Sequence, residues 1–185
     1  CSSDLKSASL AILVAAALAT GAGAAGEARA QSAEEFFRGK QMSMIISTGV
    51  GGGYDLMGRF VSRHLPKQVP GNPTMVPRNM GGAGHVRAAN YMAHQAPADG
   101  TTLGVIGSPI AVNQVLGGNG VQYDAAQFNW IGTVQGTNTN LYVWSKIGVK
   151  TIEDAKKREV VIGATGAGGG AEIYPALMNN TDRKS

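Results

Sequence analysis

The chain has 185 residues, of which 16 are lysine or arginine and 12 are aspartate or glutamate, so its formal net charge is +4. The basic residues form no stripe interleaved with aromatic residues, which argues against nucleic-acid binding. Cys1 is the single cysteine, so an internal disulfide framework is excluded and the fold must rest on its apolar core.

The N-terminal segment up to Ala30 has the features of a secretory signal peptide. Lys6 precedes an apolar stretch at 7–20, and small residues lead to an A-x-A pattern at 28–30. The apolar stretch is shorter than the roughly 17 to 25 residues that span a bilayer, so we predict cleavage after Ala30 rather than a membrane anchor. The mature protein is then expected in the periplasm.

The two ends of the chain have an unusual coding property. Residues 1–4 and 182–185 can be encoded by nearly reverse-complementary strings that match a common sequencing adapter. We therefore interpret residues 1–5 and 182–185 as adapter-derived, with a native Cys1 as the alternative. Cys1 also precedes the signal peptide, and this order argues against a lipid anchor.

Strands and helices alternate along the first part of the mature chain. We predict strands at 42–48, 74–76 and 102–106, and helices at 57–65 and 86–94. The first helix is indicated by apolar residues at helical spacing, and proline- and glycine-rich turns separate the elements. Such alternation is typical of βαβ units around a parallel sheet, so the predicted fold class is α/β.

The pattern is looser beyond Pro109. We predict further strands at 130–134, 141–144 and 160–163, and a helix at 171–178. A helix start is also indicated at Thr151, a good N-cap residue, because acidic residues follow it in the first turn. We expect a first domain at 31–128 and the start of a second, incomplete domain at 129–181.

The first candidate site is the loop from Thr48 to Asp55, between a predicted strand and a predicted helix. Its glycines let the backbone approach a ligand, and N–H groups at a helix start favour an anion. Ligands of open parallel sheets lie at the carboxyl ends of strands, where this loop is expected. The glycines are Gly49, Gly51, Gly52 and Gly53. A tight turn without a ligand is the alternative.

The second candidate site is the glycine-rich loop at 163–170, again between a predicted strand and a predicted helix. Gly166, Gly168 and Ala171 fit the G-x-G-x-x-A form of a dinucleotide fingerprint. The acidic residue expected about 20 positions later falls beyond the chain, so this signal is weak and we predict no cofactor.

Catalytic and metal-binding constellations are hard to assemble. Three histidines lack metal-ligand spacing and are interpreted as packed or surface residues: His64, His85 and His94. Ser108 lacks the G-x-S-x-G pattern of a nucleophile elbow and is interpreted as a hydrogen-bond donor or turn cap. Asp55 is interpreted as a helix cap and Asp99 as a turn residue. We therefore predict no enzymatic activity and no metal site.

The sequence leaves the roles of two tryptophans and two asparagines open. Trp130 and Trp144 fall in predicted strands, which favours core packing over stacking on a ligand. Asn138 and Asn140 lie between those strands, and they fit either the lining of a cleft or a solvated hairpin loop.

Four ordered motifs resemble the Bug family, the periplasmic substrate-binding receptors of tripartite tricarboxylate transporters. The motifs are GVGGGYD at 49–55, NMGGAG at 79–84, APADGTTLG at 96–104 and VIGATGAGGG at 161–170. The resemblance covers nearly all of the mature chain. It implies a two-lobed type II periplasmic-binding fold, of which the C-terminal part is missing here.

The resemblance also implies a function and a set of ligand-binding residues. A small carboxylate would lie between the lobes and be delivered to integral-membrane transporter subunits by a monomeric receptor. The implied ligand-binding residues are Thr48, Gly49, Gly51, Gly52, Gly53, Asp55 and Ser108 in the first lobe, and Thr165, Gly166, Ala167 and Gly168 in the second. A secreted α/β enzyme using Asp55, Ser108 or a histidine is the alternative, and a solute sensor that signals to a membrane partner is another.

Overall fold

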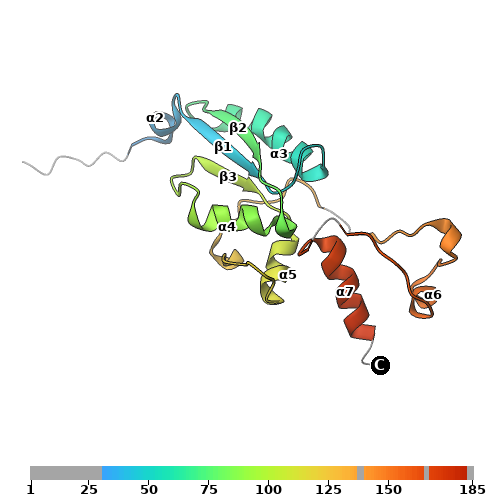
Figure 1. The fold of residues 1–185 in the computed structure, drawn as a ribbon. Coiled ribbons are helices and arrows are strands. Elements are labelled where there is room, and N and C mark those ends of the chain that lie inside the picture. Colours follow the sequence, from blue (N-terminus) through green and yellow to red (C-terminus); the bar gives the residue numbers. More distant parts are fainter. Residues whose placement is uncertain (1–30, 137–139, 165–166, 183–185) are drawn as a thin grey trace, which may run out of the picture.

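The structure is a computed structural model, and it describes residues 31–136, 140–164 and 167–182 (Figure 1). Three strands form a parallel sheet in the order β2-β1-β3. They are β1 (Gln41–Ile46), β2 (Thr74–Asn79) and β3 (Thr102–Val105). The predicted α/β class with a parallel sheet is therefore confirmed, and β2 extends three residues beyond the predicted 74–76.

Helices cover the sheet on opposite sides (Figure 1). Helix α3 (Gly53–His64) connects β1 to β2, and α4 (Val86–His94) connects β2 to β3. A Cβ at Gly58 of α3 would lie 2.6 Å from the Ile46 side chain, so glycine lets this helix approach the sheet closely. With neighbours on both faces and at both edges, β1 is the buried centre of the sheet, as its predicted apolar run requires.

The register places the carboxyl ends of the three strands together. Ile46 is the last residue of β1 and pairs with Asn79 at the end of β2 and with Val105 at the end of β3. The loops that follow the strands, at 47–52, 80–82 and 106–108, consequently meet at one edge of the sheet.

The remaining elements are helices and turns of 3-10 helix. Helices are α2 (Ala33–Phe37), α5 (Pro109–Val115), α6 (Ile152–Lys156) and α7 (Gly170–Asp182). Turns of 3-10 helix are η1 (Leu65–Gln68), η2 (Ala83–His85), η3 (Ala125–Gln127) and η4 (Ser145–Ile147). Helix α7 lies beside α5 (Figure 1). None of the helices in the described ranges is long and apolar enough to cross a membrane.

A small apolar core lies where α4 and α5 meet the segment after α5. It consists of Val86, Ala89, Ile110, Tyr123 and Ala125. The Tyr123 hydroxyl donates a hydrogen bond of 2.9 Å to the Ile110 carbonyl oxygen, so the one polar atom of this side chain is satisfied inside the core.

The predicted strands at 130–134, 141–144 and 160–163 are wrong. These segments have no ladder partner among the described residues, and they carry exposed apolar side chains such as Ile131 and Val161. Composition can identify an apolar segment, but a strand also requires a neighbouring strand to bond its backbone. The predicted core packing of Trp130 and Trp144 is also wrong, because these side chains are 60% and 71% exposed.

The predicted helix start at Thr151 is confirmed. The Thr151 hydroxyl accepts from the Asp154 N–H, and the Asp154 carboxylate accepts from the Thr151 N–H, which together form a capping box. The boundary predicted between two domains near residue 129 stays a prediction.

Candidate functional site

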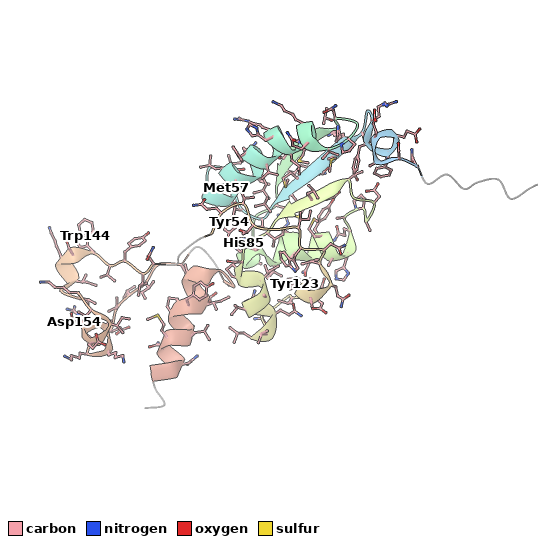
Figure 2. The ribbon with its side chains drawn as sticks, turned by 180° about the vertical axis from the view of Figure 1, so that it is seen from behind. Tyr54, Met57, His85, Tyr123, Trp144 and Asp154 are labelled. Atoms are coloured by element: carbon pink, nitrogen blue, oxygen red, sulfur yellow. The ribbon has the colours of Figure 1, made fainter. Side chains whose placement is uncertain are left out.

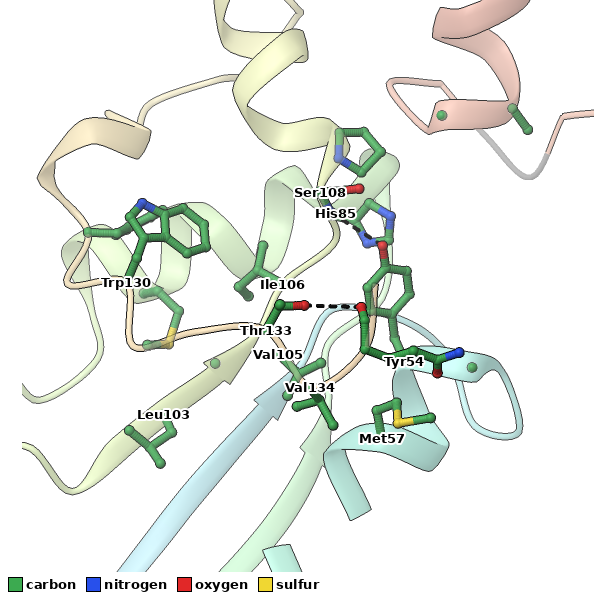
Figure 3. Close-up of a pocket in the computed structure, with 18 of the residues that line it drawn as sticks. Tyr54, Met57, His85, Leu103, Val105, Ile106, Ser108, Trp130, Thr133 and Val134 are labelled. Carbon is green, nitrogen blue, oxygen red and sulfur yellow. Dashed lines mark hydrogen bonds between the residues drawn. The ribbon is translucent and has the colours of Figure 1, made fainter. Parts of the chain in front are cut away.

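A large cleft runs along β3 and reaches the edge of the sheet where the strands end. It has a volume of about 2200 Å³, and α3, β3 and the segment after Phe128 contribute to its lining. Tyr54, Met57 and His85 lie near one another at this edge, whereas Trp144 and Asp154 lie in the part of the chain away from the sheet (Figure 2). The close-up in Figure 3 shows Tyr54, His85 and Ser108 grouped at one end of the cleft.

The first glycine-rich loop is held by the buried carboxylate of Asp55. This carboxylate accepts hydrogen bonds from the Gly51 N–H at 2.9 Å, from Arg59 Nε at 3.0 Å and from Asn79 Nδ2 at 2.8 Å. Asn79 Nδ2 also donates to the Thr48 carbonyl oxygen, and Arg59 donates to Asn79 Oδ1. Asp55 therefore connects the loop after β1 with the end of β2 instead of facing a ligand.

The hydrogen bonds around Asp55 stabilise its charged form. The Arg59 side chain contributes most, followed by the Gly51 N–H and the Asn79 amide, and they lower the pKa of Asp55 from 3.8 to about 2. The carboxylate is consequently ionised at neutral pH, and its negative charge is compensated inside the protein by Arg59.

His85 joins all three loops at the sheet edge. Its Nδ1 lies 3.0 Å from Ser47 Oγ and 3.2 Å from the Ser47 carbonyl oxygen, and its ring packs edge-on against the Tyr54 ring at 5.3 Å. The Gly107 N–H donates to Ser47 Oγ at 3.1 Å. Burial lowers the pKa of His85 below 6.5, more than the hydrogen bond to Ser47 raises it, so the imidazole is neutral at pH 7.

Replacement of Gly107 by alanine is expected to destabilise this junction. A Cβ at Gly107 would lie 2.4 Å from Nε2 of His85, so the imidazole would have to move and lose its contact with Ser47. Overpacking of this kind costs about 1–3 kcal/mol, which chemical denaturation would measure. Gly132→Ala is the control, because nothing lies within 4 Å of a Cβ there. Equal stability of both variants would contradict the proposed role of the His85 contact.

A second junction connects the NMGGAG motif with the last glycine-rich loop. A Cβ at Gly84 would lie 2.1 Å from the Gly168 carbonyl carbon and 2.4 Å from the Gly169 nitrogen, so the two backbones are in direct contact. Ala83, Gly84 and His85 have φ angles of 47°, 56° and 80°, a run of left-handed backbone that is costly for the two residues with side chains. Gly81 of the same motif lies next to the first loop, where its Cβ would be 3.1 Å from the Gly49 nitrogen, so the NMGGAG motif contacts both predicted ligand loops.

The two predicted ligand loops contain the same kind of local hydrogen bond. In each, a glycine N–H donates to the carboxylate four residues later: Gly51 to Asp55 at 2.9 Å, and Gly168 to Glu172 at 2.5 Å. A carboxylate in the first turn also suits the positive end of the helix dipole. These two N–H groups are therefore already paired within the protein.

The structure separates the predicted ligand-binding residues into two groups. Gly53 and Ser108 line the cleft. Residues of the first loop that lie outside this lining are Thr48, Gly49, Gly51, Gly52 and Asp55. Ala167 and Gly168 also lie outside it, and they line a smaller cavity of about 470 Å³ beside α7. Thr165 and Gly166 lie outside the described residues, as does Asn138, whereas Asn140 lies on the lining of the large cleft.

Comparison with known proteins identifies no relative. No protein-family model, no curated protein and no solved structure matches this chain. The function must therefore be inferred from the geometry of the cleft and from the motifs of the sequence.

Polar groups line one end of the cleft, which we call the polar end: Gly53, Tyr54, His85 and Ser108. Because Nδ1 of the neutral His85 ring donates to the Ser47 carbonyl oxygen, its Nε2 is an acceptor, and the donors of the polar end are on the other three residues. Gly53 is the first residue of α3, and its N–H has no acceptor among the described residues. The Ser108 hydroxyl makes no capping bond to α5, and the Tyr54 hydroxyl accepts from the Ser108 N–H at 3.3 Å (Figure 3). These groups are therefore free to donate to a ligand.

Sequence reasoning missed several residues that build this edge. Asn79 and Arg59 hold the first loop through Asp55, and His85 joins the loops. The sequence did contain a signal for His85, because a histidine directly follows the NMGGAG motif. This pattern indicates a strained turn beside a side chain that can form hydrogen bonds to neighbouring loops. Among the described residues, no cluster of three or more histidine, cysteine or acidic side chains is placed to hold a metal ion.

Proposed function

We propose that the protein is an extracytoplasmic solute-binding protein that captures a small carboxylate in the cleft at the carboxyl edge of its sheet. The observation that carries this proposal is the polar end of the cleft, where Gly53, Tyr54 and Ser108 offer unpaired donors beside a helix start. Backbone and hydroxyl donors at such a position favour an anionic group.

The sequence motifs support an export and delivery role. The signal-peptide features up to Ala30 indicate a periplasmic location, and the four motifs that resemble the Bug family imply a two-lobed receptor. On this proposal the protein delivers its solute to integral-membrane transporter subunits. The contact between the second and last motifs through Gly84 and Gly168 agrees with a ligand held between two lobes.

Binding is favoured over catalysis by the side-chain pairing in the described residues. Ser47 is next to His85, but its side chain is only 2% exposed and it does not line the cleft. Ser108 lines the cleft, but no contact joins its hydroxyl to a base. A serine nucleophile needs both exposure and a hydrogen-bonded base, and neither serine has both.

The proposal predicts opposite effects of Gly53→Pro on stability and on binding. Gly53 is the first helical residue, where proline fits, and the variant loses only an N–H that has no protein acceptor. We expect stability to rise by about 0.4–1 kcal/mol because the unfolded chain is restricted. Affinity for the carboxylate should fall about tenfold or more, because a hydrogen bond to a charged group is lost.

The measurement is a calorimetric titration of the full chain with hits from a thermal-shift screen. The screen contains dicarboxylates, tricarboxylates, acidic amino acids and aromatic acids, and stabilisation should increase with ligand concentration. Gly53→Ala is the matched control, since it keeps the N–H and nothing lies within 4 Å of its Cβ. Unchanged affinity in Gly53→Pro, or no stabilisation by any acid, would refute the proposed site.

A further inference from the structure

The walls of the cleft differ in chemistry from its polar end. Away from Gly53, Tyr54, His85 and Ser108, the lining of the cleft is mainly apolar and aromatic. Met57 of α3 and Leu103, Val105 and Ile106 of β3 and its extension form one wall, and the segment from Trp130 to Val134 runs along another (Figure 3). A ligand that fills this cleft must therefore bury apolar surface.

The lining also lacks compensating positive charge. None of the described residues that line the cleft is lysine or arginine. His85 is held neutral by burial, and His94 is engaged by the Gln122 carbonyl oxygen at 2.7 Å. Asp124 is the acidic residue on the described lining, and its carboxylate accepts from the Gln114 amide and the Ala126 N–H, which keeps its pKa low and its charge negative.

The two properties together select a class of solute. Neutral donors can hold one carboxylate, as backbone N–H groups do at helix starts. A second or third carboxylate would have to leave water for apolar walls without a cationic partner, near the negative charge of Asp124, and such burial is strongly unfavourable.

We infer that the solute is a monocarboxylic acid with an aromatic or similarly bulky apolar body. The inference rests on the proposed solute-binding function and specifies the ligand of the same cleft. The carboxylate pairs with the polar end at Gly53 and Ser108, and the apolar body lies against Leu103, Ile106 and Trp130.

The test compares acids that differ in one property at a time. Phenylacetate, acetate, succinate and citrate are titrated into the full chain at pH 7, together with uncharged phenylacetamide. We expect phenylacetate to bind about tenfold or more tightly than each of the others, since acetate lacks the ring, succinate and citrate carry additional charge, and phenylacetamide lacks the anion.

A variant connects the preference to the apolar wall. Trp130 is 60% exposed, so Trp130→Ala should fold and should weaken phenylacetate by about fivefold or more without changing acetate binding. Val115→Ala is the control, because Val115 is 86% exposed on α5 and lies outside the cleft lining. No change of phenylacetate affinity in Trp130→Ala would overturn the placement of the ring.

The other outcomes separate the two proposals. Succinate or citrate binding as tightly as phenylacetate would overturn the inferred solute class and leave the solute-binding function standing. Phenylacetamide binding as tightly as phenylacetate would show that the polar end does not select an anion. Binding of none of these compounds at millimolar concentration would overturn the solute class, and the function would be contradicted as well if no acid of the thermal-shift screen stabilised the protein.

Discussion

Gly84→Ala is expected to separate the last glycine-rich loop from the rest of the sheet edge. A Cβ at Gly84 would lie within 2.5 Å of three backbone atoms of Gly168 and Gly169, and backbone cannot rotate away as a side chain can. The φ of 56° adds roughly 1–2 kcal/mol for any residue with a Cβ. We therefore expect a loss of stability of several kcal/mol, or undocking of α7 and the loop before it.

Two measurements and a matched control isolate the clash. Denaturant unfolding gives the loss of stability, and hydrogen exchange of residues 167–182 reports undocking as faster exchange confined to that segment. Gly39→Ala has the same kind of positive φ, 72°, but nothing lies within 4 Å of its Cβ, so it reports the cost of the backbone conformation alone. Equal effects of the two variants would mean that the Gly84 contact with Gly168 contributes nothing.

Asp55→Asn is expected to lower the thermal midpoint by about 5 °C or more and to remove an acid-dependent part of the stability. The carboxylate accepts from three donors, on Gly51, Arg59 and Asn79. The side-chain amide of asparagine would place its own N–H group opposite one of those donors, so that hydrogen bond would be lost. The partly buried charge of Arg59 would also lose its anionic partner.

The direction of the pH effect follows from the lowered pKa of Asp55. Its pKa is about 2 in the folded protein, where Arg59 and the loop N–H stabilise the carboxylate, and 3.8 is its ordinary value. The stabilisation is therefore complete above pH 3.8 and is lost as the pH falls towards 2. The stability difference between wild type and Asp55→Asn should shrink over that range.

Thermal unfolding between pH 2 and 6 would measure this dependence. Glu153→Gln on α6 is the control, because Glu153 is exposed and no hydrogen bond to its carboxylate is found in the described part of the chain. A pH-independent difference between wild type and Asp55→Asn would contradict the role of the Asp55 charge.

Local sequence signals were sufficient where a segment's own residues decide its structure. The apolar run at 42–48 and the helical spacing at 57–65 predicted β1 and α3, with the helix starting four residues earlier, at Gly53. Thr151 with Asp154 predicted a cap, since the hydrogen bonds of a capping box lie within four residues. Asp99 likewise accepts from Thr101 in a local turn.

Local signals failed where a distant partner is decisive. The segments around Trp130 and Trp144 have the composition of strands, but the described residues provide no strand with which these segments could pair. The glycines of the first loop indicated an anion site, but Gly51 already donates to Asp55, so only part of the loop is available to a ligand. A carboxylate four residues away is visible in the sequence, whereas its preference for an internal donor is not.

The sequence by itself determined the α/β class, the parallel strands and the position of glycine-rich loops after them, because periodicity, caps and turns act over a few residues. Only the tertiary structure decided which donors remain free and which side chains share the cleft. Gly53, His85 and Ser108 come from the segments that follow three different strands, and they meet because the strand register aligns the ends of β1, β2 and β3. That alignment depends on contacts between residues far apart in the chain, which a local pattern does not encode.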